Sequence, residues 1–278
     1  KNYGLSAARN TGLANATGDY VFYIDSDDWL LPNTLQSLID ELYKNQFEDM
    51  VIGNYINKKN NSLFFPTSTE SILLQRSDVI LKALFKEIIN INAWNKLIRR
   101  DILISSNIYF IDGILFEDVP WSYDVYHKID RILVCPQIVS YSYEYNVNSI
   151  FNTAKSNYKK SLDSYIIITN YLLDSLEYQN NNNVLFFVDE IIFIERYFFK
   201  ATELFSISDR TNIDKQSFNK TRKRLVKYVI KNRLFFLSSA SILFYYPFFY
   251  VQHLKLFRHN FHKIERLVRN IESFLHKL

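Results

Sequence analysis

Three carboxylates follow a short apolar run near the start of the chain. The run at residues 20–24 is rich in β-branched and aromatic side chains, which is typical of a buried strand, and Asp25, Asp27 and Asp28 come directly after it. Closely spaced carboxylates repel one another unless a cation or several hydrogen-bond donors compensate them. Oxygen-only ligands suit a hard divalent ion such as Mg²⁺ or Mn²⁺. The cluster therefore favours an α/β sheet that binds a nucleotide or phosphorylated ligand at its carboxyl end.

The hydrophobic pattern divides the chain into two regions. Up to about residue 150, strand-like and helix-like segments alternate, which indicates a layered α/β domain. The expected elements include a helix from residue 33 with Leu35, Leu38, Ile39 and Leu42 on one face, a strand at 49–55, a helix from Ser77, and two strands at 132–134 and 138–143. Long helical patterns follow at 158–178, 185–205 and 216–231. We place the boundary between residues 152 and 153 and expect a helical region at 153–278.

Cysteine content and charge distribution indicate the redox compartment and the kinds of partner. The single cysteine, Cys135, excludes an internal disulfide, fits a reducing compartment and lies in an apolar run, which favours a core thiol. Residues 215–278 carry 14 Lys and Arg but only two acidic residues, whereas residues 1–214 carry an excess of acidic residues. Such an asymmetry indicates two regions with different partners.

The basic tail contains an uncharged stretch at residues 234–251. Its 18 residues reach the lower limit for a membrane span, and basic residues flank it on both sides. We favour a helix that lies on an anionic membrane surface. A true span, or a helical subdomain or homodimer contact with a basic solvated face, remain alternatives. Because the centre of the tail is uncharged, lipid fits it better than nucleic acid, and we expect no nucleic-acid partner.

Several motifs together resemble the family 2 glycosyltransferases. Residues 2–13 read N-Y-G-L-S-A-A-R-N-T-G-L, which resembles the family's N-x-G-x-x-x-A-R-N-x-G segment. Residues 16–32 contain A-T-G-D-Y, D-S-D-D and a final proline, and residues 117–118 resemble the E-D pair that follows roughly ninety residues later. W-N-K-L at 94–97 and Y-S-Y at 141–143 are weaker landmarks. The resemblance covers about residues 1–150.

This resemblance implies a fold and a reaction. The fold would be a nucleotide-sugar-binding α/β domain of the GT-A type, incomplete at its N-terminus because the family's first strands would precede Lys1, followed by an α-helical C-terminal region. The reaction would transfer a sugar from a nucleotide-sugar donor to a hydroxyl of a glycan or lipid-linked acceptor, with inversion. Members of this kind assemble surface polysaccharide or lipid-linked glycans on the cytoplasmic face of a bacterial membrane. The alternative is a catalytically inactive fragment, or a module that docks on a membrane or partner.

The resemblance also assigns roles on the donor side of the site. Asp27 would bind Mn²⁺ or Mg²⁺ directly, and Asp25 would meet the donor ribose or the metal. Arg9 would contact the diphosphate through its two-pronged guanidinium, and Gly4 would allow a tight backbone path near the donor. Asp28 would brace the turn. Helix capping by the aspartates, a surface salt bridge at Arg9 and an ordinary turn at Gly4 are the structural alternatives.

On the acceptor side, Asp118 would be the general base and Glu117 the second candidate. We expect a helix to begin here, and a helix N-terminus lowers the pKa of a carboxylate; helix capping is the alternative role. Trp94, Lys96 and Trp121 would line the acceptor cleft, or else lie in the core. A phosphatase of the haloacid dehalogenase type does not fit Trp29, because that family needs Thr or Val there. A calcium-binding EF-hand loop does not fit Leu30, which stands where that loop needs glycine.

Overall fold

The computed structural model describes residues 3–45, 48–66, 70–147, 149, 156–178, 184–207 and 215–231. The chain divides into two compact units, Lys1–Leu204 and Phe205–Leu278. The first unit contains the sheet and its helices. In the second, the described part of the chain includes α9 (Lys215–Lys231), and the ring of Phe205 stacks on that of Phe218 with centroids 4.3 Å apart.

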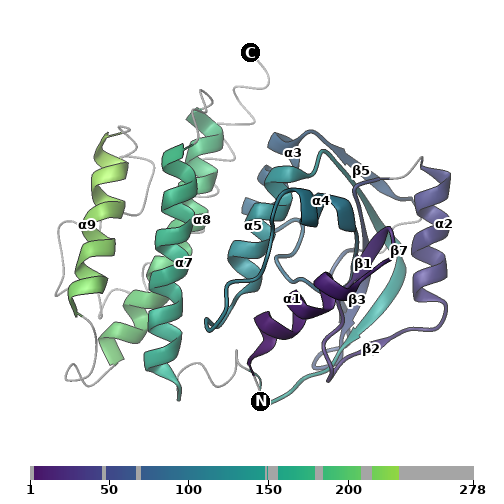
Figure 1. Ribbon diagram of the computed structural model, residues 1–278, viewed down its shortest axis with the longest axis horizontal. Helices are drawn as coiled ribbons and strands as arrows, with labels where there is room; N and C mark the ends of the chain where they lie inside the picture. Colours follow the sequence, from purple (N-terminus) through teal and green to yellow (C-terminus); the bar gives the residue numbers. More distant parts are fainter. Residues whose placement is uncertain are drawn as a thin grey trace. The chain divides into compact units, whose positions relative to one another are not determined.

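The first unit is built from one mixed sheet with helices on both faces (Figure 1). Its strands are β1 (Tyr20–Phe22), β2 (Trp29–Leu30), β3 (Met50–Asn57), β4 (Ser62–Leu63), β5 (Ile72–Gln75), β6 (Lys96–Arg99) and β7 (Arg131–Tyr143). Its helices are α1 (Leu5–Asn15), α2 (Thr34–Lys44), α3 (Ser77–Phe85), α4 (Arg100–Ser105), α5 (Asp118–Lys128), α7 (Tyr158–Tyr178) and α8 (Val184–Ile207), the last of which ends beyond Leu204. The predicted α/β class is confirmed.

The sheet runs in the order β1-β6-β3-β7-β2, with β4 paired to β3 and β5 paired to β7. β3 and β7 are parallel, and the other paired strands are antiparallel. In β3 the side chains from Met50 to Asn54 are all buried, which is typical of a central strand covered on both faces. The short strands β2, β4 and β5 were not expected, because two to four residues carry too little pattern to identify them.

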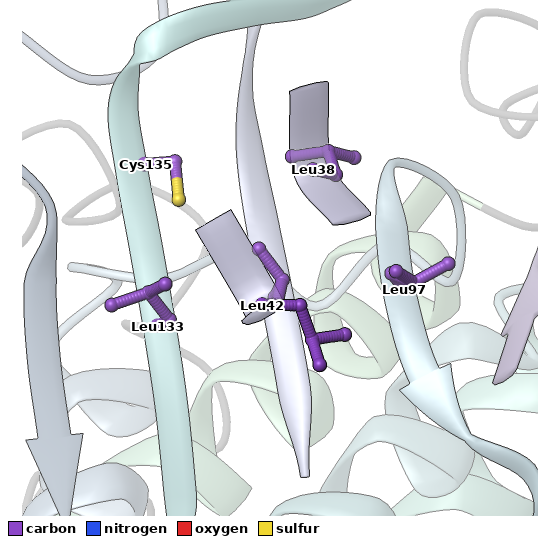
Figure 2. Packing of buried hydrophobic residues seen from close by; sticks show 6 residues of the cluster. Leu38, Leu42, Leu97, Leu133 and Cys135 are labelled. Atoms are coloured by element: carbon purple, nitrogen blue, oxygen red, sulfur yellow. The ribbon is translucent and has the colours of Figure 1, made fainter. Parts of the chain in front are cut away.

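One face of the sheet is covered by α2 (Figure 2). The side chains of this layer are Leu38, Leu42, Val51, Leu97, Leu133 and Cys135. The buried thiol of Cys135 confirms the expected core position. Leu38 and Leu42 are buried as predicted, whereas Leu35 is 42% exposed, because α2 turns that position away from the sheet. Burial of each such leucine stabilises the fold by about 1.5–3 kcal/mol.

The two strands expected at 132–134 and 138–143 form one strand, β7. The pairing of β7 with β3 shifts register around Gly53 and Asn54, so the strand continues through an irregularity at residues 136–138. Pro136 has no N–H to donate, and its carbonyl accepts a hydrogen bond of 3.0 Å from the Asn54 side chain. Asn95 donates to the carbonyls of Gly53 and Asn54 at 2.9 and 3.2 Å, so the irregular backbone stays hydrogen-bonded.

Gly53 lies where β3 and β7 approach closely, and this predicts a sensitive position. A Cβ at Gly53 would lie 1.9 Å from Ser140 Oγ, whereas a Cβ at Gly12, on the exposed side of α1, would meet nothing within 4 Å. We expect Gly53→Ala to lower the free energy of unfolding by about 1–3 kcal/mol. Gly12→Ala is expected to raise it by about 0.5–1 kcal/mol, because alanine favours a helix interior. Urea denaturation of both variants checks the pair, and equal effects would contradict the packing argument.

The three long helices expected in the C-terminal half of the chain are present. α7 has the expected bounds, and α8 and α9 match their predicted patterns within two residues. α7 contacts α5, where Tyr171 donates a hydrogen bond to Asp124. Within the part of the chain that the structure describes, no helix is both long and apolar enough to cross a membrane. The expected boundary at 152/153 and the apolar stretch at 234–251 lie outside the described residues.

Candidate active site

Helix α1 carries the first motif, and its docking sets the direction of Arg9. Gly4, the residue before the helix, has φ 92°, a backbone conformation that residues other than glycine rarely adopt. The Asn10 side chain exchanges two hydrogen bonds of 2.9 Å with the backbone of Phe110. These bonds fix α1 against the segment that leads to Glu117 and Asp118.

Arg9 binds three carboxylates that come from two distant parts of the sequence. Its Nη1 donates to Glu117 Oε1 at 2.8 Å and to Asp118 Oδ1 at 2.6 Å, while its Nη2 donates to Asp25 Oδ1 at 2.7 Å. The guanidinium is buried, so these are not surface ion pairs. The predicted acceptor-side and donor-side carboxylates therefore share one cation in one place.

The charge of Arg9 is stabilised by its surroundings. Burial disfavours the charge, but the carboxylates of Asp118, Asp25 and Glu117 outweigh it and raise the pKa of the guanidinium. The Phe110 ring lies 5.1 Å from Arg9 Cζ and covers the cation. Whether Arg9 also meets a diphosphate stays a prediction, because both of its terminal nitrogens donate to carboxylates here.

Burial decides the proton affinity of the Glu117–Asp118 pair. Glu117 is buried at the start of α5, and burial together with the charge of Asp118 raises its pKa to about 7. Burial also raises the pKa of Asp118, although Arg9 and the Ala93 N–H favour its charged form. We expected the helix N-terminus to lower the pKa of Asp118, and that expectation is wrong because desolvation is the larger effect. A raised pKa suits a general base that works near neutral pH.

Asp28 makes the bracing contacts expected from the sequence. Its N–H donates to the Asp25 carbonyl at 3.1 Å, and its buried carboxylate accepts from Tyr141 Oη at 2.7 Å and from the Glu144 N–H at 2.9 Å. Tyr141 Oη also accepts from the Asp25 N–H at 3.1 Å. Burial raises the pKa of Asp28 to about 6 despite these donors. The turn is therefore tied to β7, which the sequence did not indicate.

Asp27 lies at the exposed side of the turn. Its Oδ2 accepts a hydrogen bond of 3.1 Å from Asn146, and the neighbouring Asp25 keeps a quarter of its side chain exposed. Among the residues described, no group of three or more His, Cys, Asp or Glu side chains is arranged to hold a metal. Two partly exposed carboxylates at one turn nevertheless fit a hard divalent ion that shares a phosphate-bearing ligand. Sequence reasoning missed Asn146, because nothing in the sequence distinguishes it from any other polar loop residue.

The three residues considered for the acceptor cleft lie in the core. Trp94, Lys96 and Trp121 are at most 5% exposed, so they do not line a cleft. The ring of Trp94 stacks on those of both Tyr141 and Tyr143, with ring centroids 4.5 and 5.7 Å away. The W-N-K and Y-S-Y segments are therefore in contact. Through Tyr141 they support the turn that carries Asp25 and Asp28.

Lys96 organises the loop that contacts Asp118. Its buried ammonium donates to Asn90 Oδ1 and to the carbonyls of Asn92 and Trp94. This holds residues 90–94 in place, and within them the Ala93 N–H donates to Asp118. Burial lowers the pKa of Lys96 to about 7, while the nearby Asp118 favours its charge.

Comparison with known proteins shows which family and which folds this chain is similar to. Residues 1–105 match the family described as "Glycosyl transferase family 2". The chain is 28% identical over 169 residues to the uncharacterised glycosyltransferase EpsJ of Bacillus subtilis, covering 59% of this chain and 48% of EpsJ. It is 32% identical over 142 residues to glycosyltransferase GlyA of Streptococcus pneumoniae, covering 48% of this chain and 20% of GlyA. A cholesterol galactosyltransferase of Borreliella burgdorferi is 32% identical over 143 residues, which are 48% of this chain and 39% of that protein. The chain thus spans about half or less of the length of these relatives.

Solved structures show the same fold. The first 349 residues of S. aureus TarS in complex with UDP-GlcNAc superpose with a TM-score of 0.60 at 18% identity, over 82% of this chain and 62% of that chain. The mixed sheet with helices on both faces is thus similar to the GT-A type fold of TarS. The sequence of residues 1–105 is therefore similar to that of the family 2 glycosyltransferases, and the relatives that the chain matches are glycosyltransferases.

Proposed function

We propose that this protein transfers a sugar from a nucleotide-sugar donor to a hydroxyl of a glycan or lipid-linked acceptor, with metal assistance and inversion at the anomeric carbon. The observation that carries the proposal is the shared guanidinium of Arg9, which holds Asp118 within 2.6 Å and Asp25 within 2.7 Å. A base for the acceptor and carboxylates for the donor therefore face one small region. TarS, which shares the fold, is recorded in complex with UDP-GlcNAc, and this supports a nucleotide-sugar donor.

Asp118 is the proposed general base. Its carboxylate is fixed by Arg9 and by the Ala93 N–H, and its side chain is still 19% exposed, so an incoming hydroxyl can reach it. Accepting the hydroxyl proton would make the oxygen nucleophilic as it attacks the anomeric carbon. A single positioned base favours direct displacement. Glu117 is more deeply buried and serves as the second candidate.

Asp27 and Asp25 are the residues that would hold Mn²⁺ or Mg²⁺. When bound, such an ion neutralises the charge that develops on a departing nucleoside diphosphate. Asn146 orients the Asp27 carboxylate, and Arg9 orients that of Asp25. Gly4 gives α1 its entry geometry, and we keep it as a candidate for close backbone approach to the donor.

The setting we propose is the cytoplasmic face of a bacterial membrane. The basic, aromatic tail would bind anionic lipid, and the acceptor would be lipid-linked or part of a surface polysaccharide. The second candidate function is a module without catalytic activity that docks on a membrane or a partner. The same basic tail would provide its docking surface.

Donor turnover separates the two candidate functions. The purified protein is incubated with Mn²⁺ and UDP-GlcNAc, then with other nucleotide sugars, and released nucleoside diphosphate is measured. NMR of the product reports the anomeric configuration, and retention would contradict direct displacement. If no donor is turned over in the presence of vesicles of anionic lipid, which supply the proposed membrane surface, the docking module is the better reading.

The metal assignment gives a further prediction. Asp27 is proposed to bind the metal directly, and loss even of a residue that only supports a ligand weakens metal affinity about 10- to 100-fold. Asp27→Asn is therefore expected to weaken Mn²⁺ binding by at least about 10-fold. The Mn²⁺ concentration for half-maximal turnover should rise in parallel. Electron paramagnetic resonance of free Mn²⁺ measures binding without turnover. Asp40→Asn, which changes an exposed carboxylate on α2, is the matched control. Wild-type Mn²⁺ binding by Asp27→Asn would remove Asp27 from the metal site.

A further inference from the structure

The residue before the Glu117–Asp118 pair has an unusual backbone conformation. Phe116 has φ 61°, in the left-handed region that bulky side chains rarely occupy. A residue held there is strained, and it stays there only where surrounding contacts determine its conformation. The contacts that hold Phe116 therefore also set the direction in which the chain enters α5.

Those contacts come from α7, more than forty residues further along the chain. Ser164 Oγ accepts a hydrogen bond of 2.9 Å from the Leu115 N–H and itself donates to the Lys160 carbonyl at 2.7 Å. The next residue, Tyr165, stacks its ring on Phe116, with centroids 4.5 Å apart and planes at 8°. Both α7 side chains are buried. Two consecutive residues of α7 thus hold two consecutive residues of the loop.

The position of this loop matters for the carboxylates that follow. Glu117 is the first residue after Phe116, and the Val119 N–H donates to the Phe116 carbonyl at 3.1 Å, so Phe116 is hydrogen-bonded to the first turn of α5. A change in φ at Phe116 would swing Glu117 and Asp118 together relative to Arg9. The hydrogen bond between Arg9 and Asp118 is 2.6 Å long, so a rotation that moves the Asp118 carboxylate away from Arg9 by about 1 Å would take it beyond hydrogen-bonding distance.

We propose that Ser164 and Tyr165 are positioning residues, which hold Phe116 in its left-handed conformation and thereby keep Glu117 and Asp118 against Arg9. The catalytic consequence rests on the proposed function; the structural part does not. The helical region is then a working part of the transferase site, in addition to any docking role of its tail.

The test compares Tyr165→Leu with Tyr165→Phe. Leucine removes the stacked ring, whereas phenylalanine keeps the ring and removes only the hydroxyl. For Tyr165→Leu we expect hydrogen exchange of the amides at 115–118 to become about tenfold faster, because the stacking that holds the loop is lost. We expect kcat to fall about 10- to 100-fold through misplacement of the base. The donor KM should stay within about twofold, since the hydrogen bonds to the donor-side carboxylates come from Arg9 and Asn146 rather than from α7. Tyr165→Phe should match the wild type in exchange rate, kcat and KM.

Two further variants separate positioning from stability. Ser164→Ala is expected to act in the same direction as Tyr165→Leu, more weakly, because only one of the hydrogen bonds it removes is made to the loop. Leu172→Ala removes a fully buried side chain of α7 two turns away, and should lower the melting temperature while changing kcat less than about twofold. If Tyr165→Leu leaves exchange at 115–118 unchanged, or changes it without changing kcat, the inference is overturned. If the wild-type protein turns over no donor, the proposed function fails, and the exchange data still decide whether α7 holds the loop.

Discussion

Asp118→Asn is expected to lower kcat by about 100- to 10,000-fold, which is the usual contribution of a positioned general base. Asparagine keeps the size of the side chain, and its amide oxygen can still accept from Arg9, but it cannot take a proton from an incoming hydroxyl. The rate of the wild-type protein should fall as pH drops through the raised pKa of Asp118, because only the ionised carboxylate accepts a proton. Steady-state rates at several pH values measure both effects.

Glu117→Gln is the matched control for the base. It also removes a carboxylate that contacts Arg9, but one that is more deeply buried than Asp118. We expect a smaller loss of kcat than for Asp118→Asn, and a shift in the pH profile because the charge of Asp118 raises the pKa of Glu117, so the two carboxylates titrate as a linked pair. If Glu117→Gln is the more damaging substitution and Asp118→Asn keeps its activity, the two roles are exchanged.

Arg9→Met is expected to lower the free energy of unfolding by about 3–5 kcal/mol at pH 8, as found when one partner of a buried charge cluster is removed. The variant would leave Asp25, Glu117 and Asp118 together without their shared cation. The deficit should shrink toward pH 5. Glu117 has a raised pKa of about 7 even beside Arg9, so it takes up a proton in the folded state as pH falls, and protonation relieves the repulsion.

Denaturation in urea at pH 5 and pH 8 measures this difference. Lys44→Met is the control, because it removes a cation from an exposed ion pair with Glu41, and such pairs contribute little to stability. Its effect should be small at both pH values. A loss for Arg9→Met that is the same at pH 5 and pH 8 would show that packing of the side chain, rather than its charge, stabilises the cluster.

The sequence predicted the class of the fold and the residues of the site for different reasons. Helix α7 could be bounded from its periodicity alone, because twenty-one residues carry a strong pattern. The grouping of Asp25 with Asp118 followed from a family resemblance, since no local rule brings together residues more than ninety positions apart. The role of Arg9 as their common partner required the docking of α1 on residues 110–111, a tertiary contact that the motif does not state.

Other features of the site could not be predicted because they depend on burial. Trp94 and Lys96 have side chains that suit a sugar-binding cleft, but both are buried. Trp94 stacks on Tyr141 and Tyr143, and Lys96 lies where β6 pairs with β3. The pKa of Asp118 depends on a competition between the helix terminus and desolvation, and only the structure shows how deeply the carboxylate lies. The left-handed conformation of Phe116 has no sequence signal, since phenylalanine is among the residues least expected there.

Cys135 is a natural probe for separation of α2 from the sheet. It is the only thiol of the chain, it lies under α2 with no exposed surface, and burial raises its pKa to about 11. A thiol of this kind is protonated and shielded in the native state, so alkylating reagents can modify it only in molecules where α2 has separated from the sheet. The rate at which Cys135 is alkylated therefore measures how often α2 separates from the sheet, without a mutation or an attached dye.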